Sequence, residues 1–191
     1  MIFLDIYLDN SATTRVCPEA ADMAYKVMTE VYGNPSSTHA RGREAKKLLD
    51  AARRELSLSL GCQPKELVFT SCGSEADNWA VLSGAFAASA KGGHVISSLT
   101  EHDAIRKSLD ELERRGYEVT RLAPDESGAI PVQSVIDALR PDTVLVSLML
   151  VNNETGAVND LPGVARALKK ANSKALLHCD AVQGFLKLPF T

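Results

Sequence analysis

Val144-Leu145-Val146-Ser147-Leu148-Met149 is an almost unbroken apolar run. Such a run predicts a strand over residues 143–150 that is buried on both faces, as strands of parallel sheets are when helices cover the sheet. Around it, apolar segments with strand-like and helix-like spacing alternate along the chain. That alternation indicates βαβ crossovers. We therefore expect an α/β fold with a mostly parallel sheet and helices on both faces.

The same spacing predicts the individual elements. Strands are expected at residues 66–70, 94–97, 117–122, 143–150 and 175–179. Helices are expected at residues 18–32, in a segment that ends near Leu60, and at residues 74–90, 103–115, 131–139 and 161–171. Pro18 suits the first turn of a helix, whereas Gly33 and Gly61 suit helix ends.

Composition limits the class of protein. The chain has 191 residues, of which 45% are hydrophobic and 24% charged, enough for one domain with its own core. Its net charge of −3 and lack of basic runs make nucleic acid and anionic membranes unlikely partners. Asp5 and Asp9 interrupt the N-terminal apolar stretch, which argues against a signal peptide, and no apolar run reaches the ~18–20 residues of a membrane span.

The four cysteines indicate a compartment. They show no paired CxxC spacing, and no cysteine–histidine pair has a spacing suited to zinc. We therefore expect a reduced, cytoplasmic protein without a metal site.

Polar residues follow three of the expected strands at the carboxyl end, where open α/β sheets bind ligands. In Thr70-Ser71-Cys72-Gly73-Ser74-Glu75, Gly73 and Ser74 stand at the start of a helix. The free backbone N–H groups of a helix start, with the Ser74 hydroxyl, can hold a phosphate. The alternative is a plain helix cap formed by Ser71 or Ser74, and the two readings are compatible.

The second segment contains His102, and the third is Asn152-Asn153-Glu154-Thr155-Gly156. An imidazole at His102 can stack on a planar ring or move a proton, but a partly exposed histidine at a helix start is an equally simple explanation. The asparagines can hydrogen-bond a ring hydroxyl or can simply form a turn.

The motif His178-Cys179-Asp180-Ala181-Val182-Gln183 adds a carboxylate and an amide. Asp180 is expected at the carboxyl end of the last predicted strand, where it can bind a protonated ring nitrogen or cap a helix. Phosphate donors, a stacking ring, amides and one carboxylate fit pyridoxal phosphate better than a nucleotide, because a carboxylate keeps the pyridine nitrogen protonated. Gln183 could instead be a surface residue.

The sequence at this point resembles the cysteine desulfurases of the class-V aminotransferase group. The resemblance spans the chain and is carried by segments in the family's order: residues 7–14 (YLDNSATT), 33–39 (GNPSSTH), 101–102 (EH), 152–156 (NNETG) and 178–183 (HCDAVQ). It implies part of the large domain of a pyridoxal-phosphate enzyme of fold type I. It assigns the phosphate to Gly73 and Ser74, ring stacking and proton transfer to His102, the ring hydroxyl to Asn153 and Gln183, and the ring nitrogen to Asp180.

Two positions depart from the family pattern. Cys72 stands where glycine is more common, which would tighten the phosphate loop. Ser74 stands where threonine is common, a change that keeps the hydroxyl.

The family's cofactor lysine, its substrate arginine and its sulfur-accepting cysteine would lie beyond residue 191. The resemblance therefore implies an N-terminal segment (1–15), a truncated large domain (16–191) and no small domain in this chain. Lys187 lies in a connector and is not expected to replace the lysine. Cys17, Cys62 and Cys179 flank helices or lie in a strand, so none is expected to carry sulfur.

The implied reaction converts L-cysteine to L-alanine and transfers sulfur to an enzyme cysteine, for iron-sulfur cluster assembly or another sulfur-transfer pathway. Alone, the chain is expected to bind pyridoxal phosphate non-covalently at best and to be inactive. A homodimer or a complementary C-terminal half would then be its partner, with a sulfur-acceptor protein downstream. The alternatives are a non-catalytic remnant, a split-enzyme subunit, and a selenocysteine lyase or other class-V aminotransferase. Loss of later strands would also expose an apolar sheet edge and favour self-association.

Overall fold

A computed structural model describes residues 6–188. The chain divides into two compact units, with the boundary between Phe69 and Thr70. Every residue of the expected cofactor site falls in the second unit, so the two units are described separately. No helix in the described range is long and apolar enough to cross a membrane.

The first unit is helical. It contains α1 (Pro18–Thr29), α2 (Ala40–Leu60) and the short 3-10 helix η1 (Pro64–Glu66). Pro18 occupies the first turn of α1, and Gly61 ends α2 in a left-handed conformation with φ 68°, as predicted. α1 ends at Thr29, before the predicted end at residue 32.

The predicted strand over residues 66–70 is wrong. Pro64 starts η1, and the backbone N–H of Gln63 donates to Glu66 Oε2 at 2.7 Å, which fixes this turn. Residues 67–70 follow without joining a ladder, and Val68 is 57% exposed. A strand is stabilised by its pairing partner, and this segment is not among the four strands that pair in the described range.

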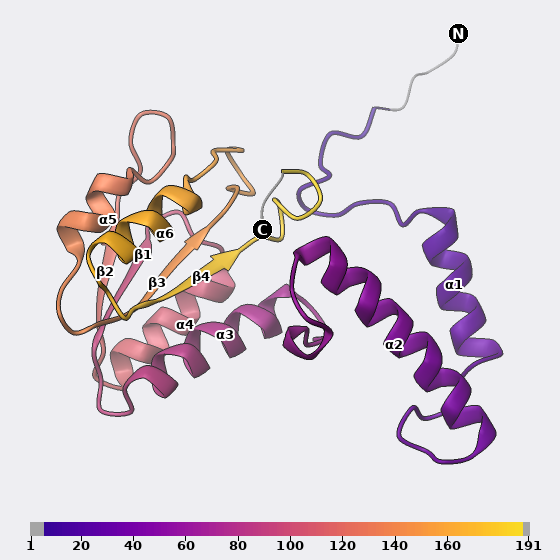
Figure 1. Cartoon of the computed structure of the whole chain (residues 1–191). Helices are drawn as coiled ribbons and strands as arrows, with labels where there is room; N and C mark the ends of the chain where they lie inside the picture. Colours follow the sequence, from indigo (N-terminus) through magenta and orange to yellow (C-terminus); the bar gives the residue numbers. More distant parts are fainter. Residues whose placement is uncertain (1–5, 189–191) are drawn as a thin grey trace, which may run out of the picture. The chain divides into compact units, whose positions relative to one another are not determined.

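The second unit is a parallel sheet with the strand order β2-β1-β3-β4. The strands are β1 (His94–Ser98), β2 (Glu118–Leu122), β3 (Thr143–Met149) and β4 (Leu176–Asp180). The helices are α3 (Gly73–Ala88), α4 (Asp103–Arg114), α5 (Val132–Ala138) and α6 (Leu161–Lys170). α3 and α4 pack on one face, and α5 and α6 cover the other (Figure 1). The predicted fold class is confirmed.

The central strands bury both faces. Val95 of β1 and its register partner Leu145 of β3 belong to the core that α3 and α4 cover. Their neighbours Ile96 and Val146 are also fully buried, and successive side chains of a strand point to opposite faces. Helices on both faces therefore account for the apolar run in β3. Leu176 of the edge strand β4 is 48% exposed, and β4 pairs only with β3 in the described range.

Candidate cofactor site

The carboxyl ends of β1, β3 and β4 lie at one edge of the sheet because all the strands are parallel. The backbone N–H of Leu150 donates to the Asp180 carbonyl at 2.8 Å, which ties the end of β3 to the end of β4. Ser98 and Met149 end the other two strands. This edge is where the predicted site residues were expected.

The start of α3 offers backbone donors. Cys72 is the N-cap residue, so neither Ser71 nor Ser74 caps the helix in the way the alternative reading proposed. Glu75 reaches back instead: its Oε2 accepts from the Ser71 N–H at 2.6 Å and from the Ser71 hydroxyl at 2.7 Å. Gly73 is half-buried and Ser74 is exposed. The donors of Ser71 are thus occupied, and the first turn at Gly73 and Ser74 is the part of the loop that can face an anion.

The surroundings of Cys72 and Cys179 shift the pKa values of the two thiols in opposite directions. The backbone N–H of Glu75, the Ser71 hydroxyl and the backbone N–H of Ser74 lower the pKa of the exposed Cys72 thiol. Cys179 lies in β4, and burial, followed by the charge of Asp180, raises its pKa to about 11. The thiolate is the nucleophile, so Cys72 is the reactive thiol of this pair.

We therefore expect iodoacetamide to alkylate Cys72 well before Cys179 in the folded chain. Peptide mass spectrometry after a brief exposure at about pH 7.5 measures the two rates. The urea-unfolded chain is the control, in which the difference should largely disappear. Equal rates in the folded chain would contradict the arrangement described here.

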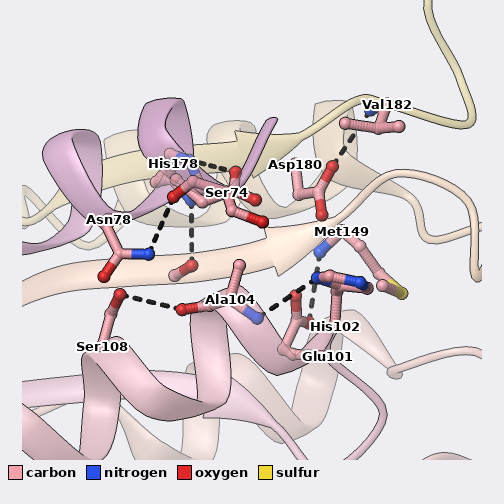
Figure 2. A network of polar contacts seen from close by, with 12 residues as sticks. Ser74, Asn78, Glu101, His102, Ala104, Ser108, Met149, His178, Asp180 and Val182 are labelled. Carbon is pink, nitrogen blue, oxygen red and sulfur yellow. Dashed lines mark hydrogen bonds and ion pairs between the residues drawn. The ribbon is translucent and has the colours of Figure 1, made fainter. Parts of the chain in front are cut away.

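His102 is exposed and is the N-cap residue of α4. Its Nδ1 accepts from the backbone N–H of Ala104 at 3.2 Å, so the proton of the neutral ring sits on Nε2 (Figure 2). The alternative prediction, an exposed histidine at the start of a helix, is therefore confirmed. The same bond also fixes the ring orientation and leaves Nε2 free for another contact.

Asn152 and Asn153 have different environments. Asn152 is buried and forms the turn: its Nδ2 donates to the Thr100 carbonyl at 2.9 Å, and its Oδ1 accepts from the N–H groups of Glu154 and Thr155. Asn153 is half-buried and lines a polar cleft together with His102. Of the two amides, Asn153 is therefore the one placed to meet a ligand.

Asp180 ends β4, as predicted, and is only 8% exposed. Its Oδ1 accepts from the backbone N–H of Val182 at 3.0 Å. The Val182 side chain lies 3.2 Å from where a Cβ on Gly73 would stand, so the turn after Asp180 packs against the start of α3. Gln183 is half-buried in this turn, and its Oε1 accepts from Lys187 Nζ at 2.9 Å.

Two further carboxyl groups surround the site. Burial, followed by the charge of Asp180, raises the pKa of Asp77 in α3 to about 6, while His102 lowers it. Burial also raises the pKa of Glu101 to about 7, and Asp180 and Asp77 add to that rise. Asp77 and Glu101 therefore lie within electrostatic range of each other and of Asp180, and Asp77 also lies within range of His102. Figure 2 shows Glu101, His102 and Asp180 of this group.

No site role was assigned to Asp77, Glu101 or His178 from the sequence. His178 Nδ1 lies 2.9 Å from Ser147 Oγ, and its Nε2 lies 3.8 Å from Asp77 Oδ1, so these three residues connect α3 to the sheet. A signal existed for Asp77, because it shares the buried face of α3 with Val81 and Ala85 at helical spacing.

The predicted residues do not all line one cavity. His102 and Asn153 share the polar cleft, whereas Ser74 lines a separate shallow hollow with Asn78 and Trp79. Asp180 and the start of α3 are joined through Val182. The structure thus places the residues at one edge of the sheet, and their individual roles stay predictions. No cluster of metal-binding side chains occurs within residues 6–188.

Comparisons with known proteins agree with this architecture. The family model "Aminotransferase class-V" matches residues 6–191. The chain is 43% identical to cysteine desulfurase IscS of Anaeromyxobacter sp. (strain K) over 98% of its own length and 46% of the relative's. Cysteine desulfurase IscS of Shewanella sediminis is 41% identical over 97% of this chain and 46% of the relative.

Solved structures give the same result. A NifS-like protein superposes with a TM-score of 0.94 at 34% identity, over 98% of this chain and 52% of that one. DndA from Streptomyces lividans superposes with a TM-score of 0.81 at 42% identity, over 96% of this chain and 51% of that one. The chain spans about half the length of the relatives it matches, and the matching part is their N-terminal part. This chain belongs to the class-V aminotransferase family.

Proposed function

We propose that this chain forms the cofactor-binding part of a pyridoxal-phosphate-dependent cysteine desulfurase, acting on L-cysteine and passing sulfur toward iron-sulfur cluster assembly or another sulfur-transfer pathway. The observation that carries the proposal is the placement of the α3 start, His102 and Asp180 at one edge of the sheet. The similarity to cysteine desulfurases supports the choice within the family. We further propose a dimeric, cytoplasmic protein that works with a sulfur-acceptor partner.

The residues fit pyridoxal phosphate chemically. Asp180 is a buried carboxylate with one oxygen held by the Val182 N–H, so its position is fixed before a cation arrives. The first turn of α3 supplies backbone N–H groups and the positive end of a helix dipole for a phosphate. When bound, pyridoxal phosphate supplies an electron sink for reactions at the α-carbon of an amino acid.

The chain's own side chains would then act as follows. Gly73 and Ser74 would bind the phosphate, and Asp180 would hold the proton on the ring nitrogen. His102 would lie on the ring face, with its Nε2 able to carry a proton because Nδ1 is occupied by the Ala104 N–H. Asn153 and Gln183 would donate to the ring hydroxyl.

Titration of the chain with pyridoxal phosphate, followed by absorbance, tests this proposal. We expect saturable binding that is tighter than binding of pyridoxal, which lacks the phosphate. Ser74→Ala should weaken the phosphate-dependent part by roughly 5-fold, the loss of about one hydrogen bond. Ser59→Ala on α2 is the matched control, because the Ser59 hydroxyl only donates to its own helix at Glu55.

The proposal fails if pyridoxal and pyridoxal phosphate bind equally and Ser74→Ala has no effect. Such a result would favour the non-catalytic remnant instead. Desulfurase activity is the second readout, measured as alanine formed from L-cysteine after this chain is mixed with a chain that carries the remaining length of its relatives.

A further inference from the structure

Glu101 lies at the centre of the contacts that join the candidate site's loops. Its Oε1 accepts from the Ser98 hydroxyl at 2.6 Å. The same oxygen accepts from the Met149 N–H at 3.2 Å (Figure 2). Ser98 ends β1, and Met149 ends β3. One carboxyl oxygen therefore links the loop that leads to His102 to the end of the neighbouring strand β3 by hydrogen bonds.

A second contact runs beside the first. Asn152 Nδ2 donates to the Thr100 carbonyl at 2.9 Å. Glu101 and Asn152 thus fasten the same two segments, one of which carries His102 and the other Asn153. Both segments line the polar cleft. The relative position of the two ligand-facing side chains depends on these two contacts.

The other Glu101 oxygen is unusual. Oε2 is buried from solvent and has no hydrogen-bond partner within the described residues. The whole residue is 4% exposed. A full negative charge there would be desolvated and incompletely paired, whereas a neutral acid leaves one uncharged polar group unpaired, which costs much less than an unpaired charge.

Burial raises the pKa of Glu101, the hydrogen bonds from Ser98 and Met149 lower it, and the nearby charges add to the rise. Carboxylates approach from two other elements, Asp180 of β4 and Asp77 of α3, and both oppose a negative charge on Glu101. The remaining titratable or charged groups around the cleft are His102, Asp103, Arg106 and Glu154. Arg106 is paired with Asp103.

We propose that Glu101 is a positioning residue. As an uncharged carboxylic acid it holds the His102 loop against the end of β3, and so it fixes the relative position of His102 and Asn153. The site it organises is the one of the proposed function, on which this inference rests. Glu101 itself touches neither substrate nor cofactor in this proposal. Its carbonyl-like oxygen accepts the two hydrogen bonds, and its proton removes the charge.

Replacement by glutamine tests the uncharged state directly. Glu101→Gln keeps the accepting oxygen and cannot ionise. Glu101→Ala removes the hydrogen bonds to Ser98 and Met149. A buried acid holds its proton more tightly in the folded chain than in the unfolded chain, so the wild type should lose stability as the pH rises toward neutrality. Between about pH 5.5 and 8.5 we expect the melting temperature of wild type to fall roughly 5 °C further than that of Glu101→Gln. Glu154→Gln, an exposed change at the same cleft, should follow wild type.

Nuclear magnetic resonance of the His102 ring supplies a readout that needs no cofactor. We expect the His102 signals of Glu101→Gln to match wild type at about pH 6, where Glu101 is uncharged, and those of Glu101→Ala to shift or broaden. Pyridoxal phosphate affinity should follow the same order, within about 3-fold of wild type for glutamine and at least about 10-fold weaker for alanine.

Two results would overturn the inference. One is a Glu101→Gln chain whose melting temperature falls with pH as steeply as wild type. The other is a Glu101→Gln chain whose His102 signals are as disturbed as those of Glu101→Ala. If pyridoxal phosphate does not bind wild type, the proposed function fails, but the ring signals and the pH dependence still decide the role of Glu101.

Discussion

Asp180→Asn is expected to weaken pyridoxal phosphate binding about 10- to 100-fold while leaving the chain folded. A hydrogen bond to a charged partner contributes about 1.5–3 kcal/mol, and each ~1.4 kcal/mol is tenfold in affinity. Asparagine has nearly the same shape and can still accept from the Val182 N–H, the bond that fixes Asp180. The variant therefore removes the charge without removing the local turn. The same absorbance titration measures the effect.

The thermal stability of Asp180→Asn should rise although its affinity for pyridoxal phosphate falls. The charge of Asp180 raises the pKa of both Asp77 and Glu101, so its removal lowers both pKa values. Raised pKa values of acids cost stability as the pH rises through them, so near pH 8 we expect Asp180→Asn to unfold at a higher temperature than wild type. Asp137→Asn, an exposed change on α5 that contacts Gln133, is the control and should alter neither property.

Weaker cofactor binding combined with higher thermal stability distinguishes a residue that binds the cofactor from one that supports the fold. Weaker binding together with lower stability would mean that Asp180 acts mainly through folding. Unchanged binding would contradict its place at the ring nitrogen and weaken the proposed function.

The fold and the positions of most site residues could be predicted because they depend on local rules. The apolar run of β3 requires cover on both faces, and parallel strands bring their carboxyl ends to one edge. Asp180 at the end of β4 and His102 at the start of α4 follow from those rules alone. The positions of Asp180 and His102 follow from the regular alternation of short strands and helices along the chain.

The parts that failed depend on distant partners. Residues 66–70 have the composition of a strand, but a strand needs a neighbour, and the sequence does not say whether one is available. The buried, proton-holding state of Glu101 arises from Met149, Asp77 and Asp180, which are far apart in sequence. A glutamate before a helix normally lies in solvent, so the burial of Glu101 could not be predicted from the local sequence.

The opposite edge of the sheet holds the residue whose loss should most affect stability. His94 is fully buried at the start of β1, with Nδ1 2.8 Å from Thr143 Oγ1 and Nε2 2.8 Å from Thr120 Oγ1. One imidazole thereby joins the three strands β1, β2 and β3. His94→Ala would leave a cavity and unpaired hydroxyls, so we expect a loss of about 3 kcal/mol in the free energy of unfolding. Guanidinium unfolding near pH 7.5 measures it, and Thr120→Val should cost only about 1 kcal/mol because it removes one of the bonds.

The effect should depend on pH with a fixed sign. Burial, followed by the positive charge of Arg140, lowers the pKa of His94, although Asp142 and Glu118 partly oppose this. A histidine with a lowered pKa in the folded chain stabilises it above the unfolded pKa of about 6.5, and this contribution is lost as the pH falls. Protonation would also turn both ring nitrogens into donors. The difference in unfolding free energy between wild type and His94→Ala should therefore shrink steadily below about pH 6.5. A constant difference would mean that folding does not lower the pKa of His94, and a difference that grows toward acid pH would mean that the folded chain favours the charged imidazole.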